Sequence, residues 1–273
     1  MDESRTFLAA LKSRIGAIEG QKPVEDRLFA LGAARLDARL GGGLPCGRLH
    51  ELFAVHPDDR AALAGAGLML ALRIGKQAPG EGVVLWLRQD SGVRASGLLH
   101  GPGLAELGFD PARLIEVVAP DEAGLLRAAG EAVRCSPLAA VLIEPWKAAH
   151  GFDLTVSRRL AVAAEKSGVT VLLLRAEAEP GPSAAYSRWR VRSIASTPLE
   201  AGAPGHPHVE IELLRHRGGI AGLRASLEWN RDEHLFREAA LSGAVLSVVA
   251  GRPADTVDPD GTGAQGFGSR ISV

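Results

Sequence analysis

The sequence predicts an α/β protein in which a doubly wound, mostly parallel central sheet is extended by antiparallel strands. Two observations lead to this fold class. Up to about residue 175, short apolar segments without polar alternation are separated by helical patterns, which is typical of parallel strands buried on both faces. After residue 180 the segments alternate more and are linked by Gly/Pro-rich turns, as in antiparallel strands. Right-handed crossovers then place helices on both faces of the sheet.

Hydrophobic periodicity places the individual elements. The predicted parallel strands are 49–54, 83–88, 114–118, 139–143 and 169–174. The helices predicted around them are 3–18, 59–76, 102–107, 121–134, 153–166 and, weakened by Gly243 and several valines, 234–250. The predicted antiparallel strands are 187–194, 208–214 and 223–229. These elements suggest an N-terminal helix and connector (1–30), a core (31–235), a C-terminal helix (236–250) and a disordered tail (251–273) rich in Pro, Asp, Gly and Thr.

Composition limits the function classes. The chain has 31 Lys and Arg against 32 Asp and Glu, so any nucleic-acid surface must be local. Cys46 and Cys135 lack the spacing of a zinc site, which fits a reducing cytosol. From the acidic start we expect no signal peptide, and no apolar run is long enough for a membrane helix. We therefore expect a cytoplasmic protein without membrane association.

The stretch from Gly41 to Ala61 has the layout of a phosphate-binding loop: a glycine-rich turn, an apolar strand, a loop and a helix. Such a loop needs a lysine for the outer phosphates and a hydroxyl for magnesium. At the expected positions the chain has Ala54, Asp59, Arg60 and Ala61. An aspartate repels phosphate and an alanine cannot hold a metal. The sequence therefore predicts a degenerate nucleotide site.

Ligands of open α/β sheets bind beyond the carboxyl ends of the strands. An ATPase needs a water-activating carboxylate after the second parallel strand and a magnesium-holding acid after the fourth. The chain has Gln89 and Glu144 there. Gln89 cannot act as a base, and Glu144 would hold a metal alone; the alternative is that such strand-end residues only line a solvated rim. We expect no catalytic residue, no metal site and no cofactor.

The best candidate for DNA contact is the segment 186–192. In a strand, Arg188, Arg190 and Arg192 point to one face together with Tyr186, while Trp189 points to the other. Cations with a nearby aromatic ring suit single-stranded nucleic acid. The alternative is an edge strand kept soluble by its arginines, with Trp189 in the core.

A second candidate is Arg215 and Arg217, together with Arg224. These cations could contact phosphate or the acidic residues of a partner, or they could simply belong to a surface turn.

Five motifs of the chain occur together in one known family: Gly41-Gly42-Gly43-Leu44-Pro45 with Gly47-Arg48-Leu49-His50-Glu51, Val84-Leu85-Trp86-Leu87-Arg88-Gln89-Asp90, Arg158-Arg159-Leu160, Ser167-Gly168-Val169-Thr170 and Ser187-Arg188-Trp189-Arg190-Val191. As a set they resemble RecA-type recombinases and, more closely, the ImuA family of RecA-like accessory proteins. The resemblance covers roughly residues 30–235. It implies a RecA-like core with a degenerate P-loop.

The resemblance also implies a non-catalytic role in SOS-induced, error-prone translesion synthesis. The implied partners are an ImuB-type adaptor that lacks polymerase activity, an error-prone DNA polymerase III alpha-type subunit reached through it, DNA, and RecA or a second copy of the chain. The chain departs from RecA in three ways. It lacks the P-loop Lys and Thr, it has Gln89 in place of the glutamate, and it has Arg175 in place of the nucleotide-sensing glutamine. These departures agree on lost ATP hydrolysis.

Two other functions are compatible with the sequence. A weak ATPase could hold nucleotide through backbone N–H groups and Arg60, and a cell-division inhibitor of the SulA kind is also RecA-like. The extended core and the ImuA-like motifs make the second alternative less favoured.

Overall fold

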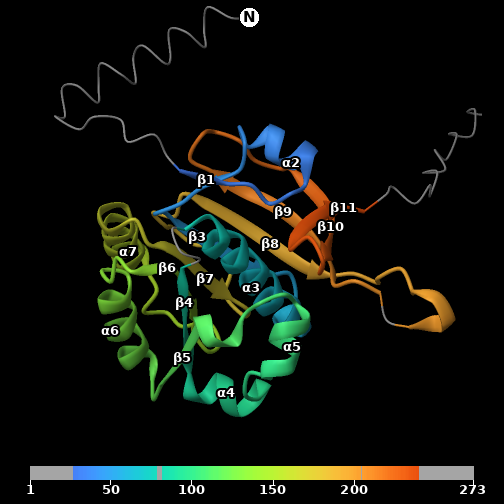
Figure 1. Cartoon of the computed structure of the whole chain (residues 1–273). Helices are drawn as coiled ribbons and strands as arrows, with labels where there is room; N and C mark the ends of the chain where they lie inside the picture. Colours follow the sequence, from blue (N-terminus) through green and yellow to red (C-terminus); the bar gives the residue numbers. More distant parts are fainter. Residues whose placement is uncertain (1–26, 79–81, 204, 240–273) are drawn as a thin grey trace, which may run out of the picture. The chain divides into compact units, whose positions relative to one another are not determined.

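The computed structural model describes residues 27–78, 82–203 and 205–239, so the predicted helix 3–18 and tail 251–273 lie outside the described residues. Nine strands form one sheet in the order β11-β10-β9-β8-β3-β7-β6-β4-β5 (Figure 1). Its parallel strands are β3 (Leu49–Ala54), β4 (Val83–Gln89), β5 (Leu114–Ala119), β6 (Leu138–Glu144), β7 (Thr170–Arg175) and β8 (Ser187–Ser193). Its antiparallel extension comprises β9 (His208–His216), β10 (Arg224–Asn230) and β11 (Leu235–Glu238). The predicted fold class is confirmed.

Helices cover both faces of the parallel part of the sheet. The long helix α3 (Arg60–Gln77) packs on one face, where its buried side chains join a core with β8, β9 and β10. Helices α6 (Glu122–Ala132) and α7 (Leu154–Ser167) pack side by side on the other face, over a second core (Figure 1). The short helices α4 (Asp90–Ser96) and α5 (Gly101–Glu106) connect β4 to β5.

The ends of α6 and α7 follow from local chemistry. The side chain of Asp121 accepts a hydrogen bond from the backbone N–H of Gly124, and that of Asp153 accepts one from Val156. Each satisfies a backbone donor in the first turn of its helix. Helix α7 ends at Gly168, whose φ of +79° is strained for residues with a side chain.

The segment before β3, predicted as a connector, contains regular secondary structure. It contains β1 (Leu28–Phe29), α2 (Ala34–Arg39) and β2 (Leu44–Pro45), and β1 pairs with β2. At Gly43 φ is +135°, and a Cβ would lie 2.3 Å from the carbonyl oxygen of Phe29. Only glycine fits this close approach, which explains part of the glycine run.

Two predictions about the extension are wrong. Strand β8 is predicted to be antiparallel, but it pairs in parallel with β3 and only its other edge pairs antiparallel with β9. A helix is predicted from residue 234, but residues 235–238 form β11, because Phe236 is buried against Trp229 of the neighbouring strand while Arg237 is exposed. The remainder of that predicted helix, from residue 240, lies outside the described residues.

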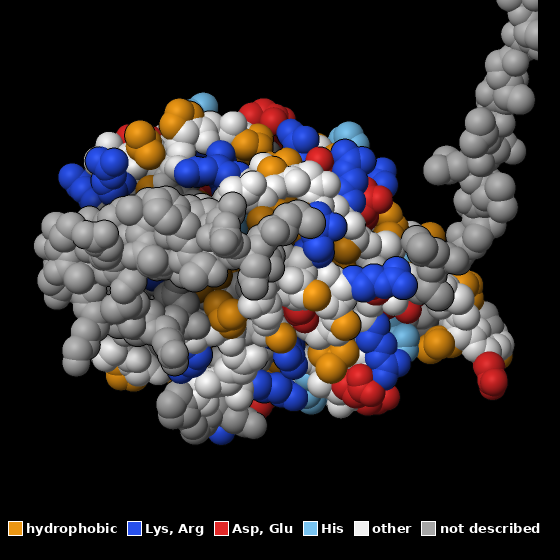
Figure 2. All heavy atoms as spheres, turned by 90° about the horizontal axis from the view of Figure 1, so that it is seen from above, with side chains coloured by type: hydrophobic (Ala, Val, Ile, Leu, Met, Phe, Trp, Pro, Cys, Tyr) orange, Lys and Arg blue, Asp and Glu red, His pale blue; other side chains and the backbone are white. Residues whose placement is uncertain are grey.

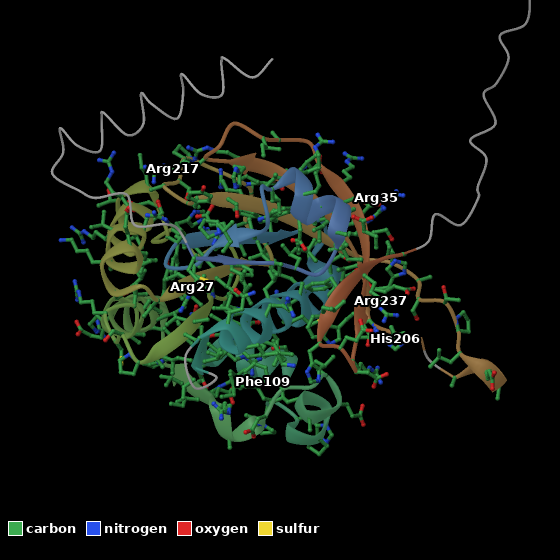
Figure 3. All side chains as sticks on the ribbon, turned by 45° about the horizontal axis from the view of Figure 1, so that its top comes forward. Arg27, Arg35, Phe109, His206, Arg217 and Arg237 are labelled. Carbon is green, nitrogen blue, oxygen red and sulfur yellow. The ribbon has the colours of Figure 1, made fainter. Side chains whose placement is uncertain are left out.

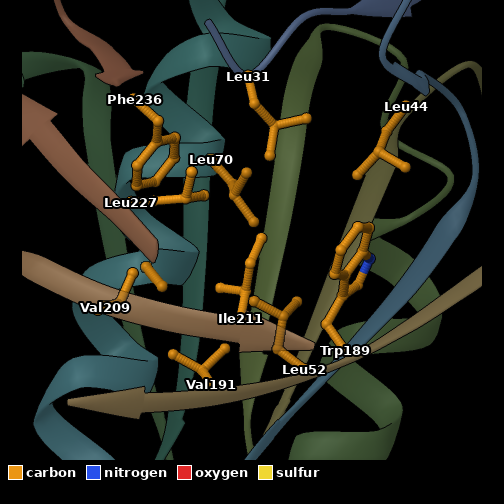
Figure 4. A pocket seen from close by; sticks show the side chains of 11 residues that line it. Leu31, Leu44, Leu52, Leu70, Trp189, Val191, Val209, Ile211, Leu227 and Phe236 are labelled. Atoms are coloured by element: carbon orange, nitrogen blue, oxygen red, sulfur yellow. The ribbon is translucent and has the colours of Figure 1, made fainter. Parts of the chain in front are cut away.

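An apolar cavity lies inside the α3-side core (Figure 4). Its walls come from α3, from the segment before β3 and from the inner face of the sheet. The lining residues are Leu31, Leu44, Leu52, Ala66, Leu70, Trp189, Val191, Val209, Ile211, Leu227 and Phe236. The polar side-chain atom among these residues, Trp189 Nε1, already donates to Ser187 Oγ, so the lining offers no free polar group to a ligand or a water molecule.

Candidate functional site

The loop that follows β3 is occupied by the chain's own carboxylate. Ala54 ends β3, a 3-10 turn spans Pro57–Asp59, and α3 begins at Arg60. Asp59 is only 6% exposed. Its Oδ2 accepts the N–H of His56 (3.1 Å) and its Oδ1 accepts the N–H of Ser193 (2.8 Å) at the end of β8. Because the Asp59 carboxylate accepts these two N–H groups, neither is available to an external anion.

Arg60 is held by a stacked aromatic ring and a carboxylate. Its guanidinium carbon lies 4.1 Å from the centroid of the Trp146 ring, and it forms an ion pair with Glu177. Gln89 supports this arrangement, since its side-chain oxygen accepts the backbone N–H of Trp146 (3.1 Å). Ala61 follows on the exposed side of α3 and adds no polar group. The structure thus brings Arg60 and Gln89 together, but around Trp146 rather than around a polar cleft.

Glu144 lies at the end of β6 and pairs with Arg88 of β4. Arg88 Nε is 3.2 Å from Glu144 Oε2, and its Nη1 is 2.8 Å from Glu116. Burial raises the pKa of Glu144, against the opposing effect of the Arg88 charge. The same guanidinium also binds Ser96 Oγ. Glu144 therefore belongs to an internal hydrogen-bonding network that joins β4, β5 and β6.

Arg175, at the end of β7, fastens the loop after β6. Its Nη2 donates to the carbonyl of Ala148 (2.6 Å), and its Nη1 donates to that of Phe152 (3.3 Å). The side chain is buried, so its guanidinium donates to backbone carbonyls within the protein rather than to a ligand.

The predicted line of three cations on β8 is interrupted at its first member. Arg188 is only 9% exposed, and its Nε lies 2.7 Å from the carboxylate of Glu51 on β3. Its Nη1 donates to the carbonyl of Gly181, and its guanidinium lies over the ring of Phe53. Arg188 is therefore a buried ion-pair partner, unavailable to DNA.

The other candidate arginines on this side are more exposed and mostly paired. Arg190 lies 3.7 Å from Glu179, and Arg192 lies 3.0 Å from Glu210. Arg224 pairs in the same way with Glu212 (3.1 Å). Arg215 donates to the carbonyl of Ser183, and Arg217 is exposed without an ion pair to any residue that the structure describes. Figure 2 shows a similar mixture of cationic and acidic side chains over the visible surface.

The rings of the two aromatic candidates pack on the other side of β8 from Arg188. Trp189 is buried, and its Nε1 donates to Ser187 Oγ. Tyr186 contacts the rings of His50 and His216 in edge-to-face geometry. His50 bonds to the same Ser187 hydroxyl, which places it on the Trp189 face of the sheet. The expectation that Tyr186 shares a face with Arg188 is therefore wrong.

His50 is the most perturbed histidine among the described residues. Its Nδ1 lies 2.7 Å from Ser187 Oγ and its Nε2 lies 3.0 Å from the carbonyl of Pro45. A carbonyl can only accept, so Nε2 carries the proton and Nδ1 accepts from the serine. Complete burial lowers the pKa of His50 from 6.5 to about 4.

Acid is expected to destabilise the protein through His50. Because its folded-state pKa lies below its unfolded-state value, the stabilising contribution is complete above pH 6.5 and is lost as pH falls toward 4. The full loss is about 3 kcal/mol. The measurement is urea denaturation at about pH 7 and pH 4.5 for the wild type and His50→Gln, in which the amide can make similar hydrogen bonds. Equal pH dependence in the two proteins would exclude His50 as the cause.

Several structurally important residues have no role in the sequence predictions. Trp146 and Glu177, which hold Arg60, come from loops whose position depends on the folded sheet. Glu51 is detectable, because a carboxylate in the middle of the apolar strand Leu-His-Glu-Leu-Phe-Ala requires a buried partner.

The described residues contain no cluster of His, Cys, Asp and Glu that could hold a metal ion. Nor does any described helix combine the length and the apolar character that crossing a membrane requires.

Comparison with known proteins finds sequences related to this chain. No family model matches it. It is 35% identical over 215 residues to the protein ImuA of Caulobacter vibrioides, in strains NA1000 / CB15N and ATCC 19089 / CIP 103742 / CB 15. The alignment covers 72% of this chain and 82% of each Caulobacter protein.

Proposed function

The chain belongs to the ImuA family, and on this premise we propose that it acts in damage-induced mutagenesis as a non-catalytic accessory protein. In this role it binds DNA and bridges the other members of an error-prone synthesis complex. Its proposed direct partner is an ImuB-type adaptor, through which it reaches an error-prone polymerase of the polymerase III alpha type. RecA or a second copy of the chain is a further candidate partner.

The observation that carries the non-catalytic part of the proposal is the occupied loop after β3. Asp59 accepts the N–H of His56 in this loop and that of Ser193 at the end of β8, and Arg60 is engaged by Trp146 and Glu177. Neither side chain is free to bind a triphosphate. The surrounding positions offer Ala61 and Gln89 in place of a magnesium-binding hydroxyl and a catalytic carboxylate.

Millimolar MgATP is therefore expected to leave the melting temperature unchanged and to show no protein-dependent phosphate release. Arg60→Ala tests the alternative of a weak ATPase, in which this arginine would hold the nucleotide. We expect the variant to match the wild type in both assays. ATP-induced stabilisation of the wild type that disappears in Arg60→Ala would support the ATPase instead.

Single-stranded DNA contact is proposed for the exposed arginines of β8 and the β9 end. Arg190, Arg192, Arg215 and Arg217 are partly or fully exposed, and phosphates could replace the carboxylate partners of the first two, which are exposed (Glu179) or partly exposed (Glu210). Surface ion pairs contribute little, so exchanging them costs little.

Fluorescence anisotropy of a labelled single-stranded oligonucleotide tests this contact, with and without MgATP over a salt series. Binding should be independent of ATP, weaken with salt, and fall at least threefold in Arg190→Ala/Arg192→Ala. Binding only in the presence of ATP would contradict the proposal. Loss of binding in every condition would leave protein bridging as the function.

A further inference from the structure

The outer surface of α6 and α7 carries cations that no described carboxylate neutralises. Arg127 projects from α6, and Arg158, Arg159 and Lys166 project from α7; all four are exposed. None forms an ion pair or a side-chain hydrogen bond within the described part of the chain. Figure 3 shows nitrogen-tipped side chains projecting from this flank. We call these four residues the helical basic surface.

The acidic residues of the two helices are used elsewhere. Asp121 and Asp153 cap the helix starts, and Glu122 accepts the N–H of Gly151 near the same ends. Beyond the first turns only Glu131 and Glu165 remain, and they pair with Arg134 and Arg48. The acids therefore lie at the helix starts or in pairs, and the four cations of the helical basic surface are left in excess.

On the outer side of β8, β9 and β10, by contrast, the arginines form ion pairs. There Arg190, Arg192 and Arg224 each have a carboxylate partner. A polyanion must displace those partners on the strands, but it can approach the helical basic surface without displacing any. Charge complementarity thus favours the helices as the stronger electrostatic contact.

The chemistry of the surface also selects the kind of polyanion. Proteins that hold single strands combine cations with aromatic rings on which bases stack. Neither Glu122–Ala132 nor Leu154–Ser167 contains an aromatic residue. Such a surface can neutralise phosphates but cannot stack bases, which fits the backbone of duplex DNA, whose bases are already stacked.

We propose that the helical basic surface binds the phosphate backbone of duplex DNA without reading its sequence. The inference rests on the proposed function and adds a second DNA contact to it. The β8 and β9 arginines would hold single-stranded DNA and the helices the adjoining duplex, so that one chain could engage both parts of a primer–template junction.

The test is anisotropy of a labelled 20-base-pair duplex across a salt series. Neutralising four phosphates predicts a slope of log K against log salt of about −3.6. Arg158→Ala/Arg159→Ala should reduce the steepness by about half and weaken binding at least tenfold at low salt, and adding Lys166→Ala and Arg127→Ala should leave only residual binding. The matched control, Arg190→Ala/Arg192→Ala, also removes two cations and should retain duplex binding within about twofold.

Melting temperatures of all variants exclude unfolding as the cause, since the substituted side chains are exposed. Unchanged duplex affinity and slope in the four-residue variant would overturn the inference. Binding of the same variants to polyglutamate is a second measurement. A variant that binds duplex normally but no longer binds polyglutamate would also overturn the inference, because the surface would then bind an acidic protein. Either result leaves the single-strand assay unaffected, so failure of this inference is distinguishable from failure of the proposed function.

Discussion

Replacing Arg188 with alanine is expected to lower the free energy of unfolding by about 3–5 kcal/mol. The reason is the burial of its partner, since Glu51 is only 2% exposed. Glu51 would keep its hydrogen bond from Ser183 but lose the only cation with which it forms an ion pair among the described residues. A buried carboxylate without a counter-charge is costly. Chemical denaturation followed by circular dichroism gives the value directly.

Two comparisons make this prediction specific. Arg190→Ala removes the same side chain two positions along the strand, where it is exposed, and should change stability by no more than about 0.5 kcal/mol. Removing both charges, as in Glu51→Leu with Arg188→Met, should cost less than Arg188→Ala alone, because no unpaired charge remains. A stable Arg188→Ala protein that loses only DNA binding would restore Arg188 as a contact residue.

Trp229→Ala is expected to cost about 3–5 kcal/mol as well, through a cavity rather than through a charge. Trp229 is 0% exposed, and its ring lies 4.9 Å from that of Phe236 in edge-to-face geometry. Its Nε1 donates to the carbonyl of Leu107 (3.0 Å), so the truncation also removes the hydrogen bond that ties β10 to the segment after α5. Thermal and urea denaturation measure the combined loss.

Trp229→Phe separates the two contributions. It retains most of the apolar contact and removes the indole donor, so its cost should be clearly smaller than that of the alanine variant. If the two substitutions are equally destabilising, the hydrogen bond to Leu107 accounts for most of the lost stability and the cavity for little of it.

The parallel part of the fold is predictable because most of its strands are apolar along their whole length and, apart from the edge strand β5, are largely buried on both faces. Strand β3 is located to the residue, since the apolar run Leu49–Ala54 is bounded by a glycine turn and a polar loop. Strand β11 is missed because four residues are too few to distinguish a period of two from a helical period. Its identity as a strand depends on pairing with β10, which no local pattern reveals.

The candidate site is predictable in position but not in its contacts. Placing Asp59, Arg60 and Gln89 at the carboxyl edge of the sheet requires only the strand order. The stacking of Arg60 on Trp146 requires the path of a loop far along the chain. The alternation of side chains along β8 correctly predicts that Arg188 and Arg190 point to the same face of the sheet. Arg188, however, lies beside Glu51 of β3 and Arg190 does not, so two side chains on one face differ in exposure.

The position of β3 at the centre of the sheet has a consequence for how the protein is made. Both of its neighbours, β7 and β8, are encoded far downstream, with Ser187 following Ala54 by about 130 residues. At roughly 5–20 residues per second, a ribosome takes on the order of 6–27 seconds to deliver the last partner. During that interval a nascent apolar strand has two unpaired edges, so newly synthesised chains are the form of this protein most exposed to aggregation and most dependent on chaperones.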